Sequence, residues 1–124
     1  MRDADDRRAA LWQGRMAERA AILALRLKRY AILERGYRIH GGEIDIIARR
    51  GDTIAFVEVK ARPTMDGALQ AITSQKRRRI CRAARVWLAA HPQAAAMTLR
   101  GDAVFVAPWR WPRHVVAAVE LDFG

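Results

Sequence analysis

The segment from Gly41 to Pro63, GGEIDIIARRGDTIAFVEVKARP, constrains the fold of this chain more than any other part of the sequence. Two runs rich in branched aliphatic residues, 44–48 and 53–59, flank a short basic stretch that ends in Gly51-Asp52. Such runs on either side of a two-residue turn predict an antiparallel β-hairpin. A loop formed by residues 51 and 52 places Asp45 opposite Glu58.

The predicted hairpin carries charged side chains among its apolar ones. Because side chains alternate along a strand, the register places two sets on opposite faces: Glu43, Asp45, Ile47, Phe56, Glu58 and Lys60 on one, and Ile44, Ile46, Val57 and Val59 on the other. Like charges directly opposed on neighbouring strands destabilise a hairpin. A divalent cation between Asp45 and Glu58 would remove that repulsion, and Mg²⁺ is commonly held by one or two carboxylates with water and substrate phosphate. Lys60 would then stabilise charge on a phosphate. The alternative is a solvated face on which Glu43 pairs with Lys60 and Asp45 with an arginine.

The remaining segments predict helices that cover a sheet. Residues 1–13 are charged and lack an apolar repeat, so we expect a flexible N-terminal arm, followed by a single domain over residues 14–124. A helical period covers residues 14–28, and residues 29–42 favour a strand. After the hairpin and a connection over residues 64–73, a helix is expected from Ser74, its N-cap, to Ala90. Two further strands are expected within residues 98–108 and 113–123, which gives a mixed α/β sandwich.

Charge indicates the kind of partner. The chain has 23 lysines and arginines against 13 acidic residues, a net charge of +10. This excess suggests a polyanion, with nucleic acid as the first choice and an anionic membrane surface as the second. No apolar run predicts a membrane span or a signal peptide. A single cysteine, Cys81, which we expect to be buried, offers no internal disulfide and fits the cytoplasm.

The hairpin residues resemble a known group of nucleases. Asp45, followed after twelve residues by Glu58-Val59-Lys60, is similar to the PD-(D/E)xK signature of restriction-endonuclease-like nucleases. The wider pattern, with GRMAERAA, AITSQKRRRI and RGDAVFVA, resembles the YraN-type bacterial family, which is considered similar to Holliday junction resolvases. The resemblance implies a restriction-endonuclease-like αβββαβ core with a mixed sheet flanked by helices.

The same resemblance implies roles for individual residues. Asp45 and Glu58 match the metal-binding acids, Lys60 matches the catalytic lysine, and Glu18 matches a first-helix acid that helps to bind the metal in the resolvases. The implied cofactor is Mg²⁺ or Mn²⁺, and resolvase-like action would favour a homodimer. Without the resemblance, Glu18 is an ordinary solvated helix residue.

Other side chains predict a nucleic-acid surface. A basic and polar set, which includes the start of the second helix, is expected to contact phosphate: Arg62, Gln75, Lys76, Arg78, Arg82 and Arg85. The alternative for these residues is a solvated helix face and an exposed strand end. We expect Asp102 to be a structural partner for an arginine. Trp109 and Trp111 are expected at the edge of the core, with base stacking as the alternative.

Three hypotheses about function follow. The first is a metal-dependent nuclease that hydrolyses DNA phosphodiester bonds in a resolvase-like manner, with DNA favoured over RNA. The second is a non-catalytic nucleic-acid-binding module on the same fold, and the third is a structural or interaction protein. Metal-dependent cleavage separates the first from the others.

Overall fold

The computed structural model describes residues 2–62 and 72–123, with the side chains of the first helix from Gly14 onward. Most of the connection predicted over residues 64–73 therefore lies outside the described residues. The elements follow the order α1 (Arg2–Leu27), β1 (Ala31–Ile39), β2 (Gly42–Arg50), β3 (Thr53–Ala61), α2 (Ser74–Ala90), the short 3₁₀ helix η2 (Pro92–Ala96), β4 (Thr98–Val106) and β5 (Arg113–Val119). This is the predicted order of helices and strands.

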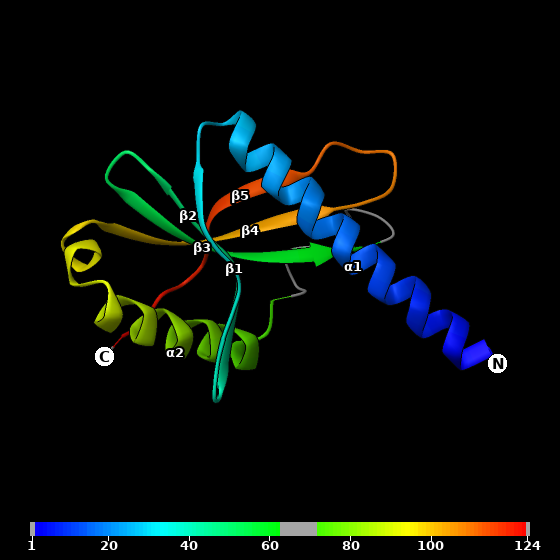
Figure 1. Cartoon of the computed structure of the whole chain (residues 1–124), viewed down its shortest axis with the longest axis horizontal. Coiled ribbons are helices and arrows are strands. Elements are labelled where there is room, and N and C mark those ends of the chain that lie inside the picture. The colour runs from blue at the N-terminus through cyan, green and yellow to red at the C-terminus, as the bar shows by residue number, and fades with distance from the viewer. Residues whose placement is uncertain (1, 63–71, 124) are drawn as a thin grey trace.

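The strands form one mixed sheet in the order β1-β2-β3-β4-β5. All neighbours are antiparallel except β3 and β4, which are parallel and are joined through α2. Helix α1 covers one face of the sheet and α2 covers the other (Figure 1). The predicted α/β fold is confirmed, and its αβββαβ core is consistent with a restriction-endonuclease-like architecture.

Two helix starts differ from the prediction. Helix α1 begins at Arg2 rather than at Gly14, so it runs through the residues assigned to the arm. Alanine and arginine favour helices even where no apolar stripe is present, and apolar periodicity does not detect such a stretch. Helix α2 is capped by Thr73, not Ser74, because the Thr73 hydroxyl accepts a hydrogen bond from the backbone N–H of Lys76 at 3.1 Å. No helix in the part of the chain that the structure describes is long and apolar enough to cross a membrane.

Each face of the sheet has its own core. The α2-side core contains Ile44, Ile47, Ile54, Phe56, Ile80, Ala83, Ala84, Trp87, Ala94 and Val119. The α1-side core contains Ala21, Ile22, Leu25, Tyr30, Ile46, Ala48, Ala55, Val57 and Val104. Strands β2 and β3 contribute to both cores, as expected for central strands that are covered on both faces. Cys81 is buried, as predicted.

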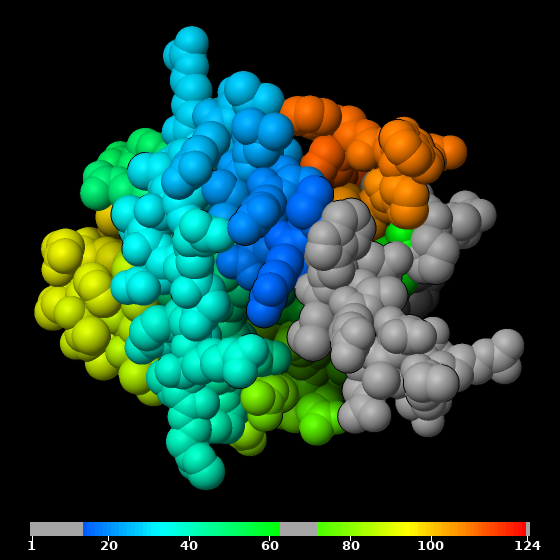
Figure 2. Space-filling model, turned by 45° about the vertical axis from the view of Figure 1, so that its right-hand side comes forward, coloured from blue at the N-terminus to red at the C-terminus, as the bar shows by residue number. Residues whose placement is uncertain are grey.

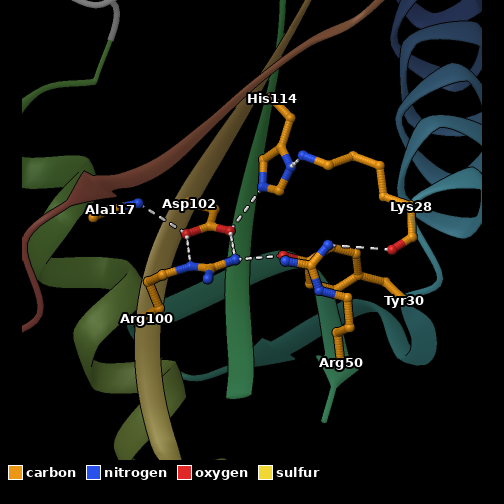
Figure 3. A network of polar contacts seen from close by, with 7 residues as sticks. All are labelled: Lys28, Tyr30, Arg50, Arg100, Asp102, His114 and Ala117. Carbon is orange, nitrogen blue, oxygen red and sulfur yellow. Dashed lines mark hydrogen bonds and ion pairs between the residues drawn. The ribbon is translucent and has the colours of Figure 1, made fainter. Parts of the chain in front are cut away.

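A buried polar network joins β4 to β5 and to the end of α1. Asp102 is fully buried and accepts two hydrogen bonds from Arg100, each 2.8 Å long, one from His114 at 2.8 Å and one from the backbone N–H of Ala117 at 3.0 Å (Figure 3). The pKa of Asp102 is lowered to about 2, since these hydrogen bonds outweigh the effect of burial, which alone would raise it. The prediction that Asp102 is a structural partner for an arginine is confirmed.

Candidate active site

The hairpin has the predicted turn but not the whole predicted register. Strands β2 and β3 pair from Arg50 and Thr53 to Ile46 and Val57, as a two-residue loop requires. Within the described residues, Ile46–Val57 is the last such pair, so the expected pairings of Asp45 with Glu58 and of Glu43 with Lys60 do not form. Instead, the carboxylate of Asp45 accepts a hydrogen bond from the backbone N–H of Val59 at 2.8 Å. The Asp45 carboxylate thus replaces the backbone carbonyl of β2 that would normally accept this hydrogen bond between the strands.

The regular alternation of side chains between the two faces of the sheet is interrupted on both β1 and β2 near Asp45. Ile44 packs in the α2-side core and Ile46 in the α1-side core, so the prediction that the two share a face was wrong. On β1, Arg35 reaches Glu18 of α1 whereas Tyr37 packs against the α2-side core. Gly36, with φ of 61°, lies between them and opposite Asp45. Glycine adopts this left-handed conformation without steric cost, so β1 can interrupt its side-chain alternation at Gly36. On β2, the Asp45 side chain points along the sheet towards β3.

Glu58 is the most unusual residue of the site, because it is a carboxylate only 1% exposed in the middle strand of the sheet. Its Oε1 atom lies 3.2 Å from the Lys60 ammonium and 3.5 Å from that of Lys76. Its Oε2 atom is buried and has no hydrogen-bond partner among the described residues. A charged face open to solvent was the alternative explanation for the acids of the hairpin. Burial of Glu58 excludes that explanation for this residue.

The site favours the neutral form of this carboxyl. Burial and, to a smaller extent, the negative charge of Asp45 raise the pKa of Glu58, whereas Lys76 and Lys60 lower it, and the net pKa is about 7. The cationic neighbours therefore do not compensate for the loss of water and the repulsion between the two acids. An additional positive charge next to Oε2 would stabilise the ionised form.

Two residues of the site, Glu43 and Lys76, have partners that the sequence did not predict. Lys76 donates a hydrogen bond to Glu43 at 2.7 Å, which lowers the pKa of the Glu43 carboxyl, and it also reaches Glu58. Glu43 was expected to pair with Lys60, and Lys76 was expected on the nucleic-acid surface. The two meet because Gly42 lets β2 approach α2 closely: a Cβ atom there would lie 2.6 Å from the carbonyl oxygen of Arg79. The only signal in the sequence is the Gly41-Gly42 pair.

Glu18 lies on the other side of the sheet, on α1. Its carboxylate lies 3.7 Å from the Arg35 guanidinium. In the described part of the chain, no three His, Cys, Asp or Glu side chains form a group that could hold a metal ion. Asp45 and Glu58 are thus brought together as a pair, without Glu18 as a third member.

The predicted phosphate contacts occupy different environments. Gln75, Arg78, Arg82 and Arg85 are exposed along α2, and Arg62 is half-buried at the end of β3. Arg82 also donates to the carbonyl oxygen of Gly41 at 3.4 Å, which brings α2 against the β1–β2 turn. Trp109 and Trp111 are both exposed, so the prediction that they seal the edge of the core was wrong. They lie in the connection between β4 and β5.

Comparison of the sequence with known proteins identifies the family of this chain. Residues 17–106 match the model described as "Uncharacterised protein family UPF0102". The chain belongs to this family. Its relatives include UPF0102 proteins of Methylocella silvestris, 95% identical over all of both chains, and of Methylobacterium nodulans, 60% identical over 94% of this chain and 90% of the relative. A UPF0102 protein of Paramagnetospirillum magneticum is 48% identical over 92% of each chain. The match to UPF0102 spans β1, β2, β3, α2 and β4, and therefore every residue of the site.

Proposed function

We propose that this UPF0102 chain is a metal-dependent nuclease that hydrolyses DNA phosphodiester bonds in the manner of PD-(D/E)xK nucleases and Holliday junction resolvases. The observation that carries the proposal is the buried Oε2 atom of Glu58, which has no partner among the described residues, in a carboxyl whose pKa the charge of Asp45 raises. Buried polar atoms are nearly always satisfied, so an exception needs an explanation. A metal ligand role explains both the missing partner and the proximity of a second carboxylate.

The donor set fits a hard divalent cation. Asp45 and Glu58 would hold Mg²⁺ or Mn²⁺ through carboxylate oxygens, with water and phosphate oxygens completing the coordination. Such an ion supplies Lewis-acid stabilisation of the phosphoryl oxygens and lowers the pKa of a bound water. The hydrogen bond from Val59 leaves the second carboxylate oxygen of Asp45 available to a ligand.

Residues of the chain provide the remaining functions. The Lys60 ammonium, next to Glu58, would donate to a non-bridging phosphate oxygen and stabilise the charge that develops there. Lys76 would keep Glu43 and Glu58 in place, since it contacts both carboxylates. The exposed arginines of α2, chiefly Arg78 and Arg82, would contact phosphates further along the DNA.

Cleavage assays test the proposal. The full chain should cut DNA, including branched DNA, with Mg²⁺ or Mn²⁺ and not with EDTA, and Asp45→Asn and Lys60→Ala should each abolish cutting. Asp52→Asn is a matched control, because Asp52 belongs to the same hairpin but lies in its exposed turn. Absence of metal-dependent cutting by the unmodified chain would refute the nuclease. Salt-sensitive DNA binding without cutting would then favour the non-catalytic binding module, which the exposed arginines of α2 also support.

A further inference from the structure

A groove lies between α1 and the segment that follows β4, on the α1 side of the sheet and next to the end of β3. It has a volume of about 600 Å³, within the range of sites that bind small molecules. Met16 and Ala20 of α1 form one wall, Arg62 lies at the end of β3, and Pro108, Trp109 and Arg110 form the other wall. The β4–β5 connection that carries Trp109 curves out beside α1 (Figure 1) and stands out at the surface (Figure 2).

Trp109 combines an exposed indole with an unfavourable backbone conformation. The side chain is fully exposed to solvent, although tryptophan has one of the largest apolar surfaces of any residue. Its backbone has φ of 60°, in the left-handed region that costs a non-glycine residue about 1 kcal/mol or more. Strain of this kind is typical of ligand clamps. An exposed indole is suited to contact a flat partner.

The charges of the groove indicate the chemistry of that partner. Two arginines, Arg62 and Arg110, are among the described residues that line it, and no acidic side chain is among them. Arg62 is two residues beyond Lys60 on β3, and its backbone N–H bonds to the carbonyl oxygen of Val106 at 2.9 Å. Through Ala61 and Arg62, the groove adjoins the end of the strand that carries Glu58 and Lys60. Its positive charge and aromatic surface match the combination that binds single-stranded nucleic acid, in which bases stack on aromatic rings beside a basic path for the backbone.

We propose that this groove binds an unpaired nucleotide of the DNA, with its base stacked on Trp109 and its phosphate between Arg62 and Arg110. This inference rests on the proposed function and narrows its substrate class. A paired base in continuous duplex exposes only its edge and cannot stack on a side chain, whereas a base in a single-stranded tail or at a branch point presents a free face. The preferred substrate therefore carries a single-stranded segment next to the cleaved phosphate.

The test is a binding experiment with the full chain in EDTA, so that the DNA stays intact. Fluorescence anisotropy is measured for a blunt duplex and for the same duplex with a single-stranded tail of about ten nucleotides. Trp109→Ala should weaken binding of the tailed duplex by roughly 5-fold to 100-fold, since stacking of one base contributes on that scale. Binding of the blunt duplex should change less than about twofold. Trp109→Phe, which keeps an aromatic face, should restore most of the lost affinity.

Trp111→Ala is the matched control, because Trp111 is a neighbouring exposed tryptophan that does not line the groove. It should leave the preference for the tailed duplex unchanged. Equal loss of affinity for both DNAs in Trp109→Ala, or no loss for either, would overturn the inference. Because the measurement needs neither metal nor cleavage, its failure is distinct from failure of the nuclease proposal.

Discussion

Replacement of Glu58 by glutamine should stabilise the protein at alkaline pH. The pKa of Glu58 rises from an ordinary value of 4.5 to about 7, chiefly through burial and then through the charge of Asp45. Each tenfold change in proton affinity corresponds to about 1.4 kcal/mol, so ionised Glu58 costs the folded state roughly 3 kcal/mol. Glutamine keeps the shape of the protonated side chain and carries no charge. Glu58→Gln should therefore exceed the unmodified chain in unfolding free energy by up to about 3 kcal/mol at pH 8.

The pH dependence has a defined sign. Between pH 4.5 and 7 the folded state binds a proton that the unfolded state has released, so stability is greatest below 4.5 and is lost as the pH rises through 7. The difference between Glu58→Gln and the unmodified chain should accordingly shrink as the pH falls. Urea unfolding followed by circular dichroism, at several pH values without divalent ions, measures it.

Glu43→Gln is the control with the opposite sign. A hydrogen bond from Lys76 lowers the pKa of Glu43, so its carboxylate stabilises the fold above its ordinary pKa, and this contribution is lost as the pH falls. Glu43→Gln should thus be less stable than the unmodified chain at pH 8. Both variants lie in the same cluster, but only Glu58→Gln should gain stability.

Addition of Mg²⁺ completes the experiment. An ion that binds only the folded state at a hundred times its Kd adds about 2.7 kcal/mol to stability. The unmodified chain should show such a gain at pH 8, and Glu58→Gln should not. The reasoning fails if Glu58→Gln is less stable than the unmodified chain at pH 8, or if Mg²⁺ stabilises both proteins equally.

Three further outcomes are expected. Asp45→Asn keeps an oxygen that accepts the hydrogen bond from the Val59 N–H, so it should leave the stability without metal equal or slightly higher while removing the response to Mg²⁺. Asp45→Ala loses this acceptor and should lower the unfolding free energy measured in urea by about 1–3 kcal/mol. Asp102→Ala removes a buried carboxylate that accepts four hydrogen bonds and leaves the half-buried Arg100 without its ion-pair partner, so it should cost roughly 2–4 kcal/mol in the same assay. An unchanged unfolding free energy would be the contrary result. Alanine at Arg78, Arg82 and Arg85 together should flatten the dependence of log affinity for DNA on log salt by about 3, and an unchanged slope would mean that these arginines do not contact phosphate.

Local patterns were sufficient for the elements of the fold and for the turn at Gly51-Asp52. Alternating apolar residues and a two-residue loop are properties of a short segment, and the paired residues from Ile46–Val57 to the turn follow from them. The second helix was also predicted to end at Ala90, as it does. The start of α1 was not predicted, because its first residues favour a helix through propensity alone.

The sequence by itself determined that two carboxylates and a lysine, Asp45, Glu58 and Lys60, lie on neighbouring strands of the sheet. It also placed Glu58 in an apolar segment that is buried when the core forms. Tertiary structure alone decided how they are arranged. The alternation of side chains between the two faces of the sheet is interrupted on β1 at Gly36 and on β2 at Asp45, two positions that lie opposite each other. Lys76 reaches Glu58 because Gly42 allows α2 to pack close to β2. The exposure of Trp109 likewise depends on how the β4–β5 connection lies against the rest of the structure. These contacts join residues far apart in the chain, and their energies depend on burial and distance, which local sequence patterns do not encode.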